Sequence, residues 1–339
     1  MKLYAGIDLH SNNNFIGIIN EQDQRLFQKR LPNRIEEVLQ ALEPFRESLE
    51  GIVVESTYNW YWIVDGLEKE GYKLSLANPS AIKQYEGLKH TDDKWDSFWL
   101  AHMKRLNILP EGYIYPKKER HVRDALRRRL MFVRQRTAHI LSFQSDVTRN
   151  LGSKMSAREI KKLDEIDADQ IFDDPFLSLT SRSHVSVIDF LSDRIKEIEK
   201  AVIEHVKIKP EFEILLTMPG IGIILGLTIM LEVGDIGRFP EVGNYSSYCR
   251  TVKSEKISND KKKGKGNQKN GNKYLAWAYV EAANFAIRSY PEVERFYNHK
   301  KSKRNGIVAI KALSNKLARV SYYVMRDQVA YDEKKLFRS

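Results

Sequence analysis

Four acidic residues are spaced so that together they could bind divalent metal ions. Asp8 lies at the end of a first apolar run, "KLYAGIDLH", and Glu55 at the end of a later one, "GIVVEST". Asp93 and Asp96 are three residues apart in a segment expected to be helical, so they share one face. If the two runs are neighbouring strands, the carboxylates converge and repel one another unless a cation is bound. Carboxylate oxygens suit Mg²⁺, or Mn²⁺, and two such ions stabilise the attacking and leaving oxygens in phosphodiester chemistry.

Each acid taken singly also has a plainer interpretation. An aspartate after a strand is often a turn residue or a helix cap, and most carboxylates are exposed. The combination favours a metal site, because the strand-end positions and the helical pair agree. Asp92, just before the pair, is expected to cap the helix or to be solvated, and His10 is expected at the surface.

The elements that would position these acids follow from hydrophobic periodicity. Apolar runs and helical spacing predict the order β-β-β-α-β-α-β-α, with helices packed on a mixed sheet. The expected strands are residues 2–10, 14–20, 25–32, 51–57 and 72–79, and the expected helices are 33–49, 58–71 and about 93–106. The domain boundary is placed at residue 115.

The composition narrows the class of partner. Lysine and arginine total 56 against 45 aspartates and glutamates, giving a net charge of +11 over 339 residues. Such an excess favours a polyanion, most often nucleic acid. We expect no membrane partner, because no apolar run is long enough to span a bilayer and the first residues are unlike a signal peptide. The single cysteine, Cys249, fits a reducing cytoplasm.

A basic helical module is predicted for residues 116–210. Nine basic residues occupy positions 117–136, in a helix expected to continue to about Asn150. Arg123, Arg127 and Arg128 are the candidates for nucleic-acid contact. Residues 153–175 are expected to form a polar linker. A seam at steps of three and four then predicts a coiled-coil partner for the first helix; its positions are Ile188, Leu191, Ile195, Ile198, Val202 and His205.

The remaining residues, 211–339, are predicted to form a mainly α domain with two candidate phosphate-binding features. The first is the hairpin Pro219-Gly220-Ile221-Gly222, whose backbone N–H groups could bind a phosphate through Gly220 and Gly222; a tight glycine corner with no ligand is equally open. The second is a glycine-rich loop, either solvated or bound to a phosphate backbone. Its candidate contacts are Lys256, Lys261, Lys262, Lys263, Lys265 and Lys273.

These motifs resemble those of one family. "GIDLH", "VVEST" and "DDKWDSFWLA" are similar to the four-acid (DEDD) signature of bacterial insertion-sequence transposases and the related pilin-gene-type DNA invertases. The Pro-Gly-Ile-Gly hairpin, the following Asp235 and Arg238-Phe239, and Gly271-Asn272-Lys273 resemble that family's C-terminal domain. The resemblance implies an RNase H-like (RuvC-like) N-terminal domain, a DNA substrate and Mg²⁺ at the four acids.

The resemblance also implies a serine nucleophile, a guide RNA and an oligomer. Counting back from Gly271, Ser258 falls on the family's nucleophilic serine. Ser254 is the competitor, because residues 250–253 and Asn259 depart from the family's pattern around that serine. Members of the family act as dimers or tetramers, and some are guided by a noncoding bridge RNA. The implied location is the bacterial cytoplasm, in association with the nucleoid.

The sequence therefore predicts a transposase or site-specific recombinase that cleaves and exchanges DNA strands. Two alternatives stay open. A RuvC-like resolvase or nuclease would use the same acids with water as nucleophile, and a nucleic-acid-binding protein would need no metal. A sugar kinase is disfavoured, because we find no second nucleotide loop after "GIDLH" and the chain is strongly basic.

Overall fold

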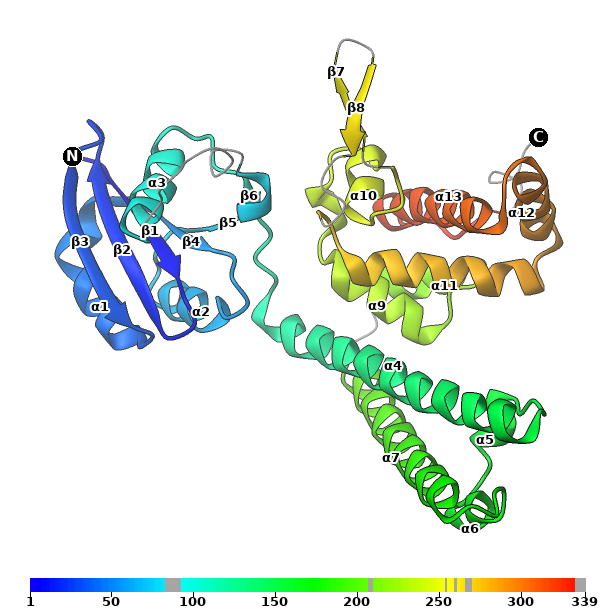
Figure 1. Cartoon of the computed structure of the whole chain (residues 1–339). Coiled ribbons are helices and arrows are strands. Elements are labelled where there is room, and N and C mark those ends of the chain that lie inside the picture. The colour runs from blue at the N-terminus through cyan, green and yellow to red at the C-terminus, as the bar shows by residue number, and fades with distance from the viewer. Residues whose placement is uncertain (83–92, 207–209, 254, 259–260, 266–269, 333–339) are drawn as a thin grey trace. The chain divides into compact units, whose positions relative to one another are not determined.

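The computed structural model describes residues 1–82, 93–206, 210–253, 255–258, 261–265 and 270–332. The chain divides into two compact units, residues 1–117 and 118–339 (Figure 1). Within the described residues, no helix combines the length and the apolarity needed to cross a membrane.

A six-stranded mixed sheet forms the centre of the first unit. Its order is β3-β2-β1-β4-β5-β6, in which β1 runs antiparallel to β2 and parallel to β4. The strands are β1 (Leu3–Leu9), β2 (Asn13–Asn20), β3 (Arg25–Pro32), β4 (Leu49–Glu55), β5 (Leu74–Ala77) and β6 (Glu111–Gly112). The predicted element order is confirmed, and β6 is an addition too short to show any periodicity.

Helices cover both faces of this sheet. Helices α1 (Ile35–Leu42) and α2 (Tyr61–Lys69) pack on the face that carries Ile52 and Val54. Helix α3 (Asp93–Arg105) packs on the opposite face, against Val53, as strand alternation requires. The helix predicted for residues 33–49 instead changes at Glu43 into a 3₁₀ segment (Glu43–Ser48), where Pro44 lacks the N–H that an α-helix would use.

Two glycines allow α3 to lie directly on the strands. Gly6 of β1 pairs with Gly17 of β2, and both face α3. A Cβ atom on Gly6 would lie 1.9 Å from the backbone oxygen of Ser97, and one on Gly17 would lie 2.8 Å from its Oγ. The absence of side chains at these two positions therefore fixes the height of α3 above the sheet, two residues from Asp8.

We expect Gly6→Ala to lower the free energy of unfolding by about 1–3 kcal/mol, because the new methyl group overlaps backbone atoms that cannot rotate away. Gly51→Ala is the matched control in β4, where the nearest atom to the added methyl group is Cε of the flexible Lys104 side chain at 3.2 Å and the backbone oxygen of Lys73 lies at an ordinary contact distance of 3.9 Å. Urea unfolding measures both variants. Equal losses in the two variants would contradict the close contact of α3 with β1.

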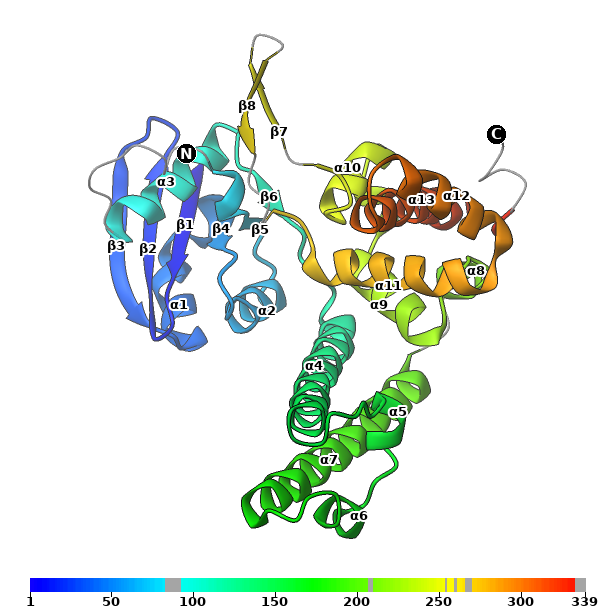
Figure 2. The same ribbon diagram turned by 45° about the vertical axis from the view of Figure 1, so that its right-hand side comes forward.

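The second unit contains a helical hairpin followed by a helical domain. Helix α4 (Lys117–Leu151) and helix α7 (Pro175–His205) run antiparallel, with Arg129 bonded to Glu199 and Arg136 bonded to Ser192 (Figures 1 and 2). Four of the six seam positions on α7 are buried, namely Ile188, Leu191, Ile195 and Val202. A regular coiled coil remains a prediction for this pair.

The prediction of a linker at residues 153–175 is wrong for the middle of that segment. It contains two short helices, α5 (Ala157–Ile160) and α6 (Glu165–Asp169), each begun by a capping box. Ile160 and Ala168 are buried against the hairpin core. The polar composition hid this, although the pattern Ser156-x-x-Glu159 is itself a signal for a helix start.

The helical domain contains six α-helices in its described residues and a two-stranded hairpin. The helices are α8 (Pro210–Leu216), α9 (Ile223–Val233), α10 (Val242–Tyr248), α11 (Lys273–Ser289), α12 (Pro291–Lys303) and α13 (Gly306–Asp327), with a 3₁₀ turn at Ile236–Arg238. The strands are β7 (Glu255–Ser258) and β8 (Lys261–Lys265), and they project away from the helices of this unit (Figure 2). Cys249 lies fully buried in its core beside Tyr245.

Candidate active site

Asp8 and Glu55 lie side by side at the ends of two parallel strands. The last registered pair of β1 and β4 joins Ile7 to Val54, so the next residue of each strand is one of the two acids. Both point to the face that α3 covers, because their neighbours Ile7 and Val54 face α1 and α2. Asp8 is 3% exposed, and its side chain shares a hydrogen bond with Glu55. The sequence predicted this pairing.

Helix α3 brings a third carboxylate toward the pair. Ser97 rests on Gly6, two residues before Asp8 in β1, and Asp96 is the residue just before Ser97. The charge of Asp96 acts on Glu55, which shows that the three carboxylates share one electrostatic environment. Asp93 is the first residue of α3, and its side chain lies outside the described part of the structure.

The crowding of these acids changes the protonation of Glu55. Burial raises the pKa of Glu55 to about 8, and the hydrogen bond with Asp8 and the charges of Asp8 and Asp96 act in the same direction. Near neutral pH the carboxyl therefore retains a proton that it shares with Asp8. A bound cation would favour the ionised form and release that proton.

His10 also belongs to this edge of the sheet, although the sequence favoured a plain surface position. Its Nε2 atom lies 3.3 Å from Oδ2 of Asp8. The backbone oxygen of His10 accepts hydrogen bonds from the side chains of Asn33 and Asn59. These two bonds tie the turn after β1 to the segments that follow β3 and β4. The sequence did contain a signal for this position of His10, because His10 follows Asp8 by two residues at the end of a predicted strand.

The donor set suits a hard divalent cation. Asp8, Glu55 and Asp96 offer only carboxylate oxygens, which are the ligands that Mg²⁺ prefers. Among the described residues, no three His, Cys, Asp or Glu side chains are close enough together to hold a metal ion. A cation bound by Asp8, Glu55 and Asp96 would therefore have to draw these carboxylates closer together than they lie here.

We expect the pH dependence of stability to reveal the raised pKa of Glu55. Because the folded-state pKa lies near 8, above the ordinary value of 4.5, the native state binds more protons than the unfolded state between these values. The stabilising contribution is complete below about pH 4.5 and is lost as the pH rises through about 8.

Urea unfolding from about pH 5 to about pH 9 should therefore show wild-type stability falling relative to Glu55→Gln. Adding Mg²⁺ should restore wild-type stability at the alkaline end and have little effect on the variant. Parallel pH profiles for the two proteins would contradict the shared proton.

The predicted serine nucleophile lies on the β7–β8 hairpin of the second unit. Ser258 is the last residue of β7, and its backbone pairs with Lys261 of β8. The side chain of Ser258 and the whole of Ser254 lie outside the described residues. Lys261, Lys263 and Lys273 are exposed, whereas the side chains of Lys256, Lys262 and Lys265 are not described.

The base of this hairpin is held by hydrogen bonds across its two ends. Arg250, with φ +55°, donates through Nε to the backbone oxygens of Asn270 and Gly271, each at 3.0 Å. The backbone N–H of Asn272 donates to the oxygen of Tyr248 at 2.6 Å. Gly271, with φ +87°, has no space for a Cβ atom, which would lie 2.5 Å from that same oxygen. The Gly-Asn-Lys element thus closes the hairpin at its base.

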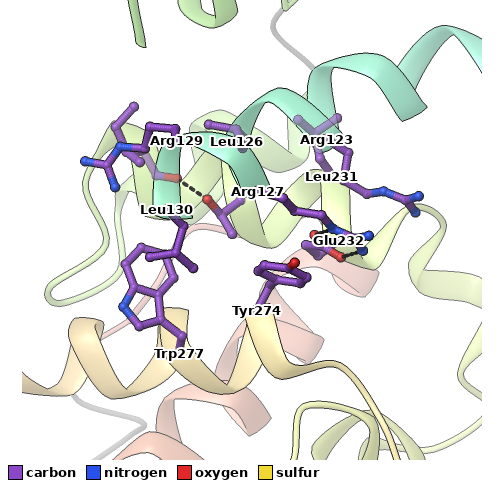
Figure 3. A pocket seen from close by; sticks show the side chains of 11 residues that line it. Arg123, Leu126, Arg127, Arg129, Leu130, Leu231, Glu232, Tyr274 and Trp277 are labelled. Carbon is purple, nitrogen blue, oxygen red and sulfur yellow. Dashed lines mark hydrogen bonds and ion pairs between the residues drawn. The ribbon is translucent and has the colours of Figure 1, made fainter. Parts of the chain in front are cut away.

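A buried ion pair connects this base to the basic helix α4. Arg127 bonds both carboxylate oxygens of Glu232, at 2.6 and 2.7 Å (Figure 3). Glu232 is 1% exposed and also accepts from Nδ2 of Asn272 at 2.7 Å. Asn272 in turn caps α11 by accepting from the backbone of Tyr274 and Leu275. One carboxylate therefore connects α4, α9 and the start of α11.

The three arginines proposed for nucleic-acid contact consequently differ in role. Arg123 is buried, at 4% exposure. Burial alone would lower the pKa of Arg127, but the bonds to Glu232 raise it above its usual range and keep the guanidinium charged. Of the three, Arg128 is exposed, and nucleic-acid contact there stays a prediction.

We expect Glu232→Gln to lower the free energy of unfolding by about 3–5 kcal/mol, because it leaves the partly buried charge of Arg127 uncompensated. Adding Arg127→Met should recover part of that loss, and a double-mutant cycle measures the coupling. The exposed pair Arg194–Glu197 is the control, with an expected coupling of about 0–1 kcal/mol. If the losses of stability from the Glu232 and Arg127 substitutions were simply additive, the two side chains would not be energetically coupled, which would contradict the importance of this ion pair.

The Pro-Gly-Ile-Gly hairpin borders a groove of about 790 Å³, lined largely by apolar side chains that include Ile223, Trp277 and Phe285. Gly220 has φ +74°, and a Cβ atom there would lie 2.1 Å from the backbone oxygen of Ala282. The close approach of α11 is therefore sufficient to explain this glycine. Gly222 precedes α9 and has open space around it, so a phosphate contact there stays a prediction.

Comparisons with known proteins agree with this arrangement. A family model described as "Transposase IS116/IS110/IS902 family" matches residues 212–298. A DEDD transposase model of the IS110 group, described as a transposase, matches residues 5–149. The transposase for insertion sequence element IS1328 of Yersinia enterocolitica is 23% identical over 332 residues, which cover 94% of this chain and 95% of the relative.

A mixed sheet that gathers acids at the ends of neighbouring parallel strands, with a helix adding another, defines a DEDD-type domain of the RNase H-like class. The first matched region contains these acids, and the second contains the part of the helical domain that runs from α8 into α12, including the β7–β8 hairpin. The chain is a DNA transposase, and both of its matched regions are similar to insertion-sequence transposases of the IS110 group.

Proposed function

We propose that this transposase excises and inserts its element by metal-dependent cleavage and exchange of DNA strands, with a serine as the nucleophile. The adjacent Asp8 and Glu55, with Asp96 delivered by α3, are the observation that carries the proposal. Asp8, Glu55, Asp93 and Asp96 would hold Mg²⁺, or Mn²⁺. When bound, the cation would stabilise negative charge on the phosphate and help to ionise the attacking hydroxyl.

The chemical step would proceed at the β7–β8 hairpin. Oγ of Ser258 attacks the phosphorus of the scissile phosphodiester, forming a serine–DNA ester as the bond to the leaving sugar oxygen breaks. The hydroxyl proton passes to a carboxylate of the acidic site, and the leaving oxygen takes up a proton. Lys261 and Lys263 are exposed beside this serine on β8 and would neutralise phosphate charge. Attack by a second strand's hydroxyl on the ester would reverse the sequence and join the strands.

The proposal includes a guide RNA and an oligomer. The positive excess of the chain can accommodate a second polyanion besides DNA, and a noncoding bridge RNA from the element would supply target choice by base pairing. The acids and the serine belong to different compact units, so a dimer or tetramer could bring the acids of one subunit to the serine of another. The reaction would take place on the bacterial nucleoid.

Trapping of covalent DNA adducts tests the nucleophile. We expect the wild-type protein with Mg²⁺ and a nicked element-end substrate to give a protein–DNA band on a denaturing gel. Ser258→Ala and Asp8→Asn should each reduce that band by at least about a hundredfold, as expected for the loss of a nucleophile or of its metal site. EDTA should have the same effect as Asp8→Asn.

The matched control is Ser254→Ala, which should retain the adduct. Loss of the adduct in Ser254→Ala with retention in Ser258→Ala would transfer the role to Ser254. Metal-dependent cleavage with no adduct from any protein would support the water-using nuclease instead. Binding without cleavage under all conditions would support a non-catalytic protein.

A further inference from the structure

Helices α12 and α13 carry a dense run of positive charge that the candidate site does not include. Between residues 295 and 319 the chain has no aspartate or glutamate. The same segment has eight basic residues, namely Arg295, Lys300, Lys301, Lys303, Arg304, Lys311, Lys316 and Arg319. Arg295 pairs with Glu292 at the start of α12, and the other seven basic residues follow without a nearby acid in the sequence. Such a basic surface next to a DNA-processing site is typical of a contact with a phosphate backbone.

One row of this surface lies beside the serine-bearing hairpin. Lys311, Asn315 and Arg319 are four residues apart along α13 and therefore share a face. Asn315 donates through Nδ2 to Oγ1 of Thr251 at 3.1 Å, and Thr251 is adjacent to Arg250 at the hairpin base. Lys311 and Arg319 flank this contact and are exposed. Within the described part of the chain, no carboxylate forms an ion pair with either of them.

A second row is concentrated between the two helices. The ammonium groups of Lys300 and Lys316 lie 5.6 and 4.7 Å from the centre of the Phe296 ring. Burial lowers the pKa of Lys316, and the neighbouring charge of Lys300 acts in the same direction. Like charges crowded in this way favour an external polyanion that would relieve their repulsion.

The chemistry of the surface favours duplex DNA over an unpaired strand. Unpaired strands are usually bound by open aromatic faces on which bases stack. Here Lys300 and Lys316 occupy the ring of Phe296, and Lys301 lies over the ring of Tyr297. Lys311 and Arg319 are about 12 Å apart along the helix axis, which matches the axial rise of three to four phosphates of one strand.

We propose that the exposed basic surface of α12 and α13 binds the phosphate backbone of duplex DNA next to the strand that the serine hairpin attacks, with Lys311 and Arg319 as the contacts closest to that hairpin. The proposal rests on the proposed function, because it places the DNA that the transposase cleaves. It assigns the surface a sequence-independent task, since ammonium and guanidinium contacts with phosphates carry no base information.

The test measures binding rather than cleavage, so it does not depend on the serine or on the metal. Full-length protein in EDTA is titrated against a labelled duplex of about 30 base pairs over a range of salt concentrations. We expect Lys311→Gln with Arg319→Gln to weaken binding roughly 10- to 100-fold and to reduce the slope of log K against log salt by about 2. The swap Lys311→Arg with Arg319→Lys should retain both affinity and slope.

The matched control removes two equally charged, exposed lysines elsewhere. Lys196 and Lys200 lie on α7 beside Asp193 and Glu204, and Lys196→Gln with Lys200→Gln should leave the slope unchanged. Circular dichroism confirms folding of every variant. An unchanged slope in the α13 variant, or the same decrease in the control, would overturn the proposal.

Parallel titrations with a duplex RNA of equal length distinguish the partner. A variant that loses RNA binding but keeps DNA binding would also overturn the proposal and assign the surface to RNA. Failure of the adduct assay together with a reduced DNA slope would refute the serine mechanism and leave this surface intact. Normal adduct formation together with an unchanged slope would refute the surface only.

Discussion

The parallel pairing of β1 with β4 is the constraint on which the N-terminal unit depends. Parallel neighbours end at the same edge of the sheet, so Asp8 and Glu55 are brought together whether or not their charges favour it. A shift of one residue in either strand would turn one acid toward α1 and α2 and separate the pair. The apolar residues that alternate with the acids prevent that shift, because they would have to leave the core. Hydrophobic burial on the opposite face of the same strands thus keeps the two carboxyl groups together.

In the second unit, the β7–β8 hairpin is positioned by hydrogen bonds rather than by strand pairing within a large sheet. Its hairpin extends from the helices, and precision must come from the few residues at its base. The carboxylate of Glu232 acts there by accepting hydrogen bonds from two side chains, those of Arg127 and Asn272. An arginine that the sequence suggests for DNA contact is instead part of the scaffold. In a nucleic-acid-binding protein, buried basic residues therefore have to be distinguished from exposed ones before a contact with nucleic acid is assigned.

Much of the first unit could be predicted, because its signals are local. Alternation and strand-end acids in β1 and β4 gave the pairing of Asp8 with Glu55, and spacing on α3 placed Asp96. The strand β6 and the two helices within the expected linker are too short to show a hydrophobic periodicity in the sequence. The contact of Gly6 with Ser97 and the bond from Arg127 to Glu232 join residues far apart in the chain, so no local pattern could reveal them. The position of Lys311 and Arg319 beside the hairpin likewise depends on Asn315 reaching Thr251.

The burial of Cys249 has a practical consequence. Its thiol lies in the core of the helical domain, and burial raises its pKa above the ordinary range, so almost no thiolate exists near neutral pH. Thiol reagents and disulfide exchange both require the thiolate, and the native chain is therefore inert toward them. A cysteine introduced at any exposed position would be the sole reactive thiol of the protein. A spectroscopic or cross-linking probe can accordingly be attached to either unit without first removing the natural residue.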